Sequence, residues 1–269
     1  MSRHSTAPSR LSALFAQCRA QDRAALMGYL PVGFPTLDES LTTMRTMVDN
    51  GCDVVEIGVP YSDPVMDGPT VARAAQEALN NGVRVRDVFV AAETVAAAGA
   101  QPVVMTYWNL VLKYGVDAFA RDLAAAGGVG IITPDLIPEE AAAWQAASDA
   151  HDLDRIYLVA PSSTPERLAM TVDSCRGFVY AASTMGVTGA RDSVSSMAPE
   201  LCARVRAHSD LPIGVGLGVR NGAQAAEIAG YADGVIVGSA IISAYLNGGQ
   251  AGVAELVTEL AEGVRGTVR

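Results

Sequence analysis

Short runs of Val, Ile, Leu and Ala recur along the chain, each followed by turn residues and then by an Ala-rich segment with helical spacing. Eight such runs occur, at residues 24–31, 52–60, 101–108, 128–135, 155–161, 177–184, 211–218 and 233–240. Continuous apolar runs of this length are typical of strands buried on both faces, as in a parallel sheet covered by helices. The pattern therefore predicts eight strands that alternate with helices.

Signals for helix starts lie between these runs. Thr36 precedes Glu39 by three residues, and the segments 163–166 and 221–224 show a similar capping-box spacing. Pro138 suits the first turn of another helix. Eight strand–helix units in a chain of this length favour a closed (β/α)8 TIM barrel, an α/β fold. A doubly wound open sheet is the alternative, because it uses the same local alternation.

Two further helices are expected outside the eight units. Residues 9–20 predict an amphipathic helix before the first strand, and residues 249–264 predict one after the eighth unit. No stretch rich in Pro, Gly or Ser divides the chain. We expect one TIM-barrel domain over residues 1–269, with a flexible tail at residues 1–8.

Composition narrows the class of protein. Half of the 269 residues are hydrophobic and 18% are charged, which is enough apolar material for a large core. The apolar runs are too short to span a membrane, and the first ten residues lack a hydrophobic signal core, so we expect a cytoplasmic protein without membrane contact. The net charge of -10 disfavours nucleic acid as a partner.

The supply of chemically versatile side chains is limited. The four cysteines, Cys18, Cys52, Cys175 and Cys202, are widely spaced, which disfavours a zinc site or a disulfide framework. Lys113 is the single lysine, and the three histidines His4, His151 and His208 fall at positions expected to be non-catalytic. We therefore expect no metal, no lysine imine and no cofactor in this chain.

Glu56 is out of place in the second apolar run, Val-Val-Glu-Ile-Gly. Side chains alternate along a strand, so Val55 and Ile57 share one face and Glu56 points to the other. If the two aliphatic residues meet the helices, Glu56 points into the barrel, where desolvation raises its pKa and makes it a proton donor near neutral pH. The alternative is a structural glutamate paired with an arginine.

The loop after this run, Pro-Tyr-Ser-Asp-Pro-Val-Met-Asp-Gly-Pro, contains Asp63 and Asp67. Taken singly, each aspartate is typical of a turn. Active sites of TIM barrels lie at the carboxyl ends of the strands, and Asp67 falls at this end, eleven positions after Glu56. Asp67 is therefore a candidate for the second carboxylate of an acid–base pair.

Three glycine-rich pieces follow later strands, at residues 183–189, 214–219 and 238–240. Loops after the last strands of a TIM barrel often bind phosphate, because glycine lets backbone N–H groups approach the anion. Each piece alone is equally typical of a tight turn. Residues 185–192 also have the composition of a lid with glycine hinges, the alternative being a solvated loop.

These residues together resemble the tryptophan synthase alpha subunit family. The resemblance rests on Val-Val-Glu-Ile-Gly-Val-Pro-Tyr-Ser-Asp-Pro-Val-Met-Asp-Gly-Pro at 54–69, then Ser-Thr-Met-Gly-Val-Thr-Gly at 183–189, Gly-Val-Gly-Leu-Gly-Val at 214–219 and Val-Gly-Ser-Ala at 237–240. It covers the chain from about Leu11 to the end. The Ser-Asp-Pro-x-x-Asp-Gly-Pro element is its most specific part.

The resemblance implies a reaction and a set of site residues. Members of the family cleave indole-3-glycerol phosphate into indole and glyceraldehyde 3-phosphate by a retro-aldol reaction in tryptophan biosynthesis. Glu56 matches the family's acid–base glutamate and Asp67 its catalytic aspartate. The substrate-binding residues that match are Tyr29 beside the indole, the active-site tyrosine Tyr180, Thr188 in the lid, and Gly189, Gly218, Gly238 and Ser239 at the phosphate.

The resemblance also implies a partner, the pyridoxal-phosphate-dependent beta subunit in an α2β2 complex that receives the indole. Pro60, Asp63 and the segment 108–115 match regions used at that interface. Two positions depart from the family pattern: Arg220 stands where relatives often have a small polar residue, and Tyr29 where others have Phe. Three alternatives stay open: a free-standing lyase, a catalytically silent allosteric barrel, and another phosphate-binding barrel.

Overall fold

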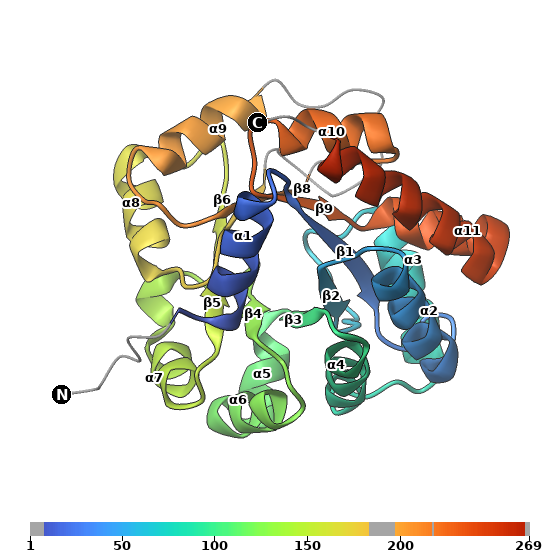
Figure 1. Ribbon diagram of the computed structural model, residues 1–269. Helices are drawn as coiled ribbons and strands as arrows, with labels where there is room; N and C mark the ends of the chain where they lie inside the picture. The colour runs from blue at the N-terminus through green and yellow to red at the C-terminus, as the bar shows by residue number, and fades with distance from the viewer. Residues whose placement is uncertain (1–7, 183–196, 217, 267–269) are drawn as a thin grey trace.

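Parallel strands alternate with helices and curve into a barrel (Figure 1). The structure, a computed structural model, describes residues 8–182, 197–216 and 218–266. Its strands are β1 Ala25–Pro31, β2 Val54–Gly58, β3 Gln101–Met105, β4 Gly130–Ile132, β5 Asp154–Ile156, β6 Leu158–Val159, β7 Val179–Ala182, β8 Ile213–Gly216 and β9 Gly234–Val237. Its helices are α1 Arg10–Ala20, α2 Leu37–Asp49, α3 Pro69–Asn80, α4 Asp87–Ala98, α5 Trp108–Tyr114, α6 Val116–Ala125, η1 Pro138–Glu140, α7 Ala142–Ala150, α8 Pro165–Ser174, α9 Met197–Arg206, α10 Gly222–Ala229 and α11 Ser239–Arg265.

The strand order shows how the sheet closes. Neighbours follow the order β5-β4-β3-β2-β1-β9-β8-β7-β6, and the two ends of this row are consecutive pieces of one extended segment. Tyr157 separates them, and its carbonyl oxygen accepts a hydrogen bond from the Tyr180 N–H at 3.2 Å. The fifth of the eight predicted strands is thus split in two. The TIM barrel is confirmed, and the open sheet is wrong.

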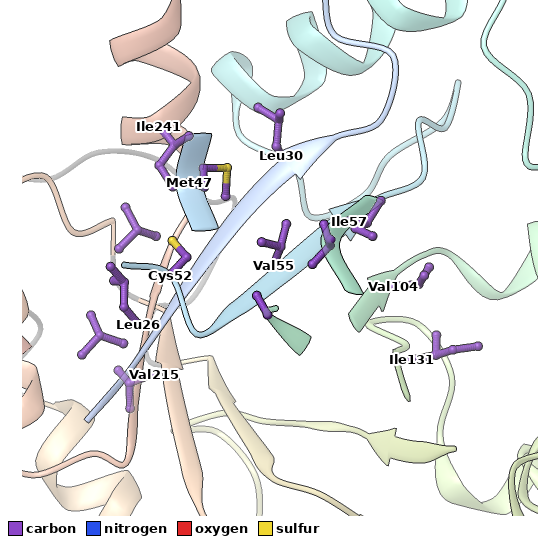
Figure 2. Packing of buried hydrophobic residues seen from close by; sticks show 14 of the residues in the cluster. Leu26, Leu30, Met47, Cys52, Val55, Ile57, Val104, Ile131, Val215 and Ile241 are labelled. Atoms are coloured by element: carbon purple, nitrogen blue, oxygen red, sulfur yellow. The ribbon is translucent and has the colours of Figure 1, made fainter. Parts of the chain in front are cut away.

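The two faces of the strands pack into two separate apolar clusters. The outer cluster joins the sheet to the helices and includes Val55 and Ile57, with Leu30 and Met47 nearby (Figure 2). The inner cluster fills the barrel and includes Val54. The alternation predicted for β2 is therefore confirmed, and Glu56 lies on the inner face.

Helix α1 closes the end of the barrel at which the strands begin. It crosses the near end of the barrel in Figure 1, and its buried residues Leu11, Phe15 and Cys18 belong to the inner cluster. The ring of Phe15 lies 5.7 Å from that of Phe178 on the opposite wall. The predicted extra helix is confirmed as a packing element, and it leaves the other end of the barrel for the chemistry.

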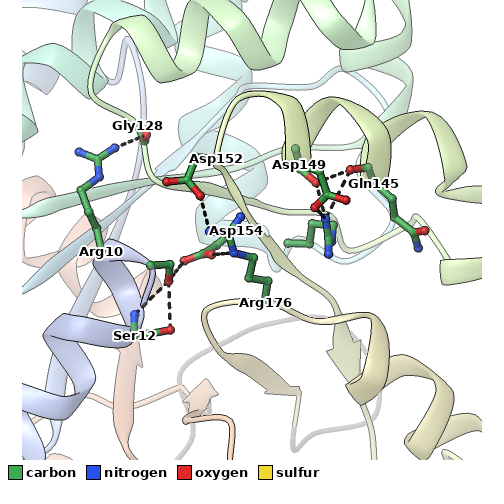
Figure 3. A network of polar contacts seen from close by, with 11 residues as sticks. Arg10, Ser12, Gly128, Gln145, Asp149, Asp152, Asp154 and Arg176 are labelled. Carbon is green, nitrogen blue, oxygen red and sulfur yellow. Dashed lines mark hydrogen bonds and ion pairs between the residues drawn. The ribbon is translucent and has the colours of Figure 1, made fainter. Parts of the chain in front are cut away.

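A polar network fastens α1 to the barrel (Figure 3). The hydroxyl of Ser9 donates to Asp154 Oδ2 at 2.6 Å, and Arg176 Nε lies 3.1 Å from Asp154 Oδ1. Arg10 donates to the carbonyl oxygen of Gly128 at 2.6 Å. Burial raises the pKa of Asp154 to about 6, against the opposing effects of Ser9 and Arg176. Ser9 thus joins the N-terminus of α1 to the start of β5.

The helix-start signals were located correctly in two of three cases. Thr36 accepts a hydrogen bond from the Glu39 N–H, and Asn221 caps α10 in the same way. At α8 the predicted start at Ser163 is one residue early, because Thr164 is the cap. Pro165 fixes the first helical φ angle, so the residue immediately before it must be the cap.

Thr36→Ala should lower the free energy of unfolding by about 1 kcal/mol, because the N-cap side chain satisfies a helix N–H that otherwise has no acceptor. The Thr36 hydroxyl also donates to Glu39 Oε2 at 3.0 Å, and the substitution removes this second bond as well. Urea unfolding measures the change. Thr42→Ala, an exposed substitution inside the same helix, is the control and should stay within about 0.5 kcal/mol of wild type.

Helix α11 is two helices joined at a break. Gly249 has φ 57° and ψ -146°, a conformation that no residue adopts inside an α-helix. The part before the break completes the eighth unit, and the part after it is the extra helix predicted at 249–264. Gln250 fixes the joint by donating to Thr43 Oγ1 on α2 at 2.8 Å.

The tail predicted at residues 1–8 lies outside the described part of the chain, except for Pro8.

The cysteines and one histidine lie away from the carboxyl ends of the strands. All four cysteines are free, and no group of metal ligands occurs within residues 8–182, 197–216 and 218–266. In that same part of the chain no helix is both long and apolar enough to cross a membrane. His151 follows α7 and pairs with Asp117 at 3.0 Å.

Candidate active site

Glu56 lies at the centre of the site, on the middle of β2. The strand register places it between Tyr29 on β1 and Val103 on β3, and its side chain is buried in the barrel. Burial raises the pKa of Glu56 to about 8, so the carboxyl group is mostly protonated at neutral pH. Its Oε1 atom meets no hydrogen-bond partner among the described residues. No arginine pairs with it there, which contradicts the structural alternative.

Asp67 is the second carboxylate at this end of the barrel. It ends the loop between β2 and α3 and is partly buried. The hydroxyl of Tyr107 donates to Asp67 Oδ1 at 3.2 Å. Burial raises the pKa of Asp67, and the bond from Tyr107 opposes this effect. Asp67 is therefore less shielded from solvent than Glu56, and the two carboxyl groups have unlike environments.

Tyr107 is a site residue that the sequence analysis missed. It precedes α5, and its hydroxyl oxygen accepts hydrogen bonds from the N–H groups of Val65 at 3.2 Å and Met66 at 3.0 Å. Its ring also packs against Tyr61, with centroids 5.1 Å apart. One side chain therefore holds both the backbone of the loop and the carboxylate of Asp67. The available signal was a tyrosine at the end of the neighbouring apolar run.

Two tyrosines stand beside Glu56, each lying across a glycine. A Cβ atom on Gly58 would come within 2.4 Å of the Tyr29 hydroxyl oxygen, and one on Gly216 within 2.5 Å of the Tyr180 hydroxyl oxygen. Burial raises the pKa of both hydroxyls, and the charge of Glu56 adds to this effect in each case. The glycines thus create the space in which the two rings line the wall around Glu56.

The predicted phosphate binders lie at the ends of two neighbouring strands. Gly218 follows β8 and has φ 70°, and Gly238 precedes Ser239, the first residue of α11. Strands β8 and β9 pair in register, so these ends meet at the same rim. A helix N-terminus preceded by glycine is suited to binding an anion. Thr188, Gly189 and the predicted lid at 185–192 lie outside the described residues.

Apolar side chains are exposed on the loops near this rim. Val65 after β2 is 71% exposed, Leu112 in α5 is 56% exposed, and Ile137 after β4 is 40% exposed. Asp63 is exposed on the same loop as Val65, whereas Pro60 is buried. The sequence analysis predicted Pro60, Asp63 and the 108–115 segment as interface residues and did not consider Val65 or Ile137. Exposed apolar groups on neighbouring loops are typical of a surface that meets another protein.

Comparison with known proteins agrees with this geometry. A family model described as tryptophan synthase alpha chain matches residues 15–265. The tryptophan synthase alpha chain of Nocardia farcinica is 70% identical over 257 residues, 96% of each chain, and that of Mycobacteroides abscessus is 66% identical over 260 residues, 97% of this chain and 99% of the other. A structure of Mycobacterium tuberculosis tryptophan synthase superposes with a TM-score of 0.93 at 65% identity, covering 96% of this chain and 99% of that one.

Proposed function

Because this chain belongs to the tryptophan synthase alpha chain family, we propose that it cleaves indole-3-glycerol phosphate to indole and glyceraldehyde 3-phosphate. Family membership makes it a lyase of tryptophan biosynthesis. The observation that carries the specific reaction is Glu56, a carboxyl group that burial keeps protonated at neutral pH on the inner wall of the barrel. A proton donor of this kind is what cleavage of a bond to indole C3 requires.

The two carboxyl groups divide the chemistry. Glu56 donates its proton to C3 of the indole, and the resulting indolenine can accept an electron pair. The Glu56 carboxylate then removes the proton from the hydroxyl group on the substrate's side chain, next to the ring. The electrons of that O–H bond form the aldehyde carbonyl. The carbon–carbon bond to C3 breaks, and its electrons move into the indole ring. Asp67 holds and polarises the indole N–H. The donated proton stays on C3 of the indole product, and the hydroxyl proton reprotonates Glu56, so the residue is ready for the next substrate.

The remaining proposed residues bind the substrate. Tyr29 and Tyr180 contact the indole from the wall beside Glu56, and their hydroxyl oxygens are held over Gly58 and Gly216. The phosphate binds at Gly218, Gly238 and Ser239, where the α11 N-terminus supplies N–H groups and a favourable dipole. Gly189 and Thr188 complete the set by resemblance alone, in which Thr188 matches the lid threonine that engages the catalytic aspartate in the family.

The proposal includes a partner, the beta subunit of tryptophan synthase in an α2β2 complex in the cytoplasm. Val65, Leu112 and Ile137 are exposed after the neighbouring strands β2, β3 and β4, and they support this partner over a free-standing lyase, because apolar side chains exposed side by side are typical of an interaction site. Solved structures similar to this chain include tryptophan synthase from M. tuberculosis. We expect the beta subunit to hold pyridoxal phosphate and this chain to need no cofactor of its own.

An indole-release assay tests the function. The purified chain is mixed with indole-3-glycerol phosphate, alone and with a beta subunit, and indole is quantified over time. We expect indole in both mixtures and faster release with the partner. No indole in either mixture would overturn the lyase assignment. Equal rates with and without the partner would overturn the complex while leaving the lyase in place.

Tyr107→Phe should lower kcat about 10-fold, because it removes the bond to Asp67 and the acceptor for two loop N–H groups. The KM for indole-3-glycerol phosphate should change less than kcat, since the ring and its packing on Tyr61 remain. Steady-state kinetics with the beta subunit measure both constants.

Tyr231→Phe is the matched control for this experiment. It removes a tyrosine hydroxyl between α10 and β9, at the end of the barrel where the strands begin and away from Asp67. Its kcat should equal that of wild type. Equal kcat values for the two variants would show that Tyr107 does not position Asp67.

A further inference from the structure

A cavity lies outside the barrel, between the loop after β1 and the first turns of α3 and α11. Its volume is about 230 Å³. Phe34 and Ala74 form a buried apolar floor, and Pro69 and Leu246 form the sides. This volume is below the about 300–1,000 Å³ of sites that hold drug-sized ligands, so only a small molecule fits. This space is therefore a candidate site for a ligand with an apolar body.

The cavity is separate from the candidate active site. Phe34 and Ala74 belong to the outer cluster, on the helix side of the sheet. Glu56 points to the inner face of the same sheet. A molecule in the cavity would thus be separated from the indole pocket by the strands themselves.

Three polar side chains also line the cavity. Arg73 is exposed in the first turns of α3, and Thr70 and Ser243 supply hydroxyl groups on the two helices. Within the described part of the chain, no ion pair or hydrogen bond joins these side chains to another residue. The positive end of the α3 dipole also lies here, because α3 begins at Pro69. One cation, two hydroxyls and a helix N-terminus favour an anionic head group.

Nearby acidic residues limit the charge of that head group. The ring of Tyr245 packs against Phe34 with centroids 5.7 Å apart. Burial raises the pKa of Tyr245, and the charges of Glu39 and Glu77 raise it further, so both carboxylates lie close to this edge of the cavity. A doubly charged phosphate would meet more repulsion there than a single carboxylate, while Arg73 can pair with one negative charge.

We propose that this cavity binds a small organic monoanion with a flat apolar body and one carboxylate. The body lies on Phe34 and Ala74, and the carboxylate pairs with Arg73 and accepts from Thr70 and Ser243. The site is an accessory one, and its ligand contacts α3 immediately after the loop that carries Asp67. The inference does not depend on the proposed lyase reaction.

Titration of the isotope-labelled full chain with 3-phenylpropionate, followed by backbone amide NMR, tests the proposal. We expect saturable shifts at the amides of residues 70–74 and 243–246. Arg73→Gln should weaken binding at least fivefold. Arg45→Gln, an exposed substitution on α2 with the same change in net charge, should bind as wild type. The neutral isostere 3-phenylpropionamide should bind at least fivefold more weakly than the acid.

The outcomes separate this proposal from the lyase assignment. Saturable shifts at those amides in Glu56→Gln protein would support the cavity independently of catalysis. Absence of shifts there at millimolar probe, or equal affinity of Arg73→Gln and wild type, would overturn it. Shifts confined to the inner wall of the barrel would also overturn it. Because binding is read without turnover, neither result bears on indole release.

Discussion

Glu56→Gln is expected to release indole from indole-3-glycerol phosphate about 10²- to 10⁴-fold more slowly than the wild-type chain, the range typical for loss of a general acid–base group. Glutamine keeps the size of the side chain but can neither donate the proton to C3 nor take the hydroxyl proton. The KM should change little, because the ring and phosphate contacts lie on other residues. Initial rates with saturating beta subunit measure the effect.

The pH dependence of the wild-type rate gives a second check on the same residue. Burial raises the pKa of Glu56 to about 8, so the donor form predominates below that pH and is lost above it. The kcat/KM should therefore fall about tenfold per pH unit once the pH exceeds this pKa. Glu93→Gln, an exposed substitution on α4, should keep both the rate and the profile. A Glu56→Gln enzyme with wild-type turnover would show that another group supplies the proton.

Local patterns in the sequence were sufficient to predict the barrel and the place of Glu56. The strands are continuous apolar runs, and period-two alternation around Val55 and Ile57 determines that Glu56 faces inward. The apolar runs and the alternation depend only on residues close together in the sequence, and so do the helix caps at Thr36 and Asn221. The one misplaced cap, at Ser163, differs from the true cap by a single residue because Pro165 decides the start.

Contacts between distant segments could not be predicted in this way. Tyr107 meets Asp67 across 40 residues, and Ser9 meets Asp154 across 145 residues. Nothing in the local sequence of either partner indicates the other. Gly58 and Gly216 were likewise missed, because their purpose is to leave room for rings that come from other strands.

The roles of Asp67, Tyr29 and Tyr180 came from the resemblance to a family, because residue spacing alone did not assign them. Taken from the residues, Asp67 was one of two turn-forming aspartates, and Tyr29 and Tyr180 had no assigned role. The structure pairs Tyr29 with Glu56 across β1 and β2, and burial together with the charges of Asp67 and Glu56 raises the pKa of Tyr29. Burial and the charge of Glu56 raise the pKa of Tyr180 in the same way, so all four residues lie within electrostatic reach of one another. Their separate roles in catalysis remain part of the proposal.

The burial that suits Glu56 to catalysis should also destabilise the fold at alkaline pH. The pKa of Glu56 is about 8 in the folded chain and near its ordinary value of 4.5 when unfolded. The folded state therefore binds this proton more tightly. Its contribution to stability is fully present below the unfolded pKa and is lost as the pH rises through the folded pKa. Above pH 8 the folded chain must hold a carboxylate in the barrel.

Glu56→Gln should thus become progressively more stable than wild type as the pH rises. Each unit of pKa difference is worth about 1.4 kcal/mol, so the advantage of the variant should grow by about 2–3 kcal/mol between pH 6 and pH 9. Urea unfolding of the isolated chain at both pH values measures the change, with Glu93→Gln as the exposed control. An advantage that stays constant with pH would mean that Glu56 has an ordinary pKa, and the proposed proton donor would then be ionised at neutral pH. If the stability of Glu56→Gln relative to wild type grows with pH and the variant no longer releases indole, then one cause explains both results. Burial of Glu56 lowers the stability of the fold and also keeps this residue protonated as the acid.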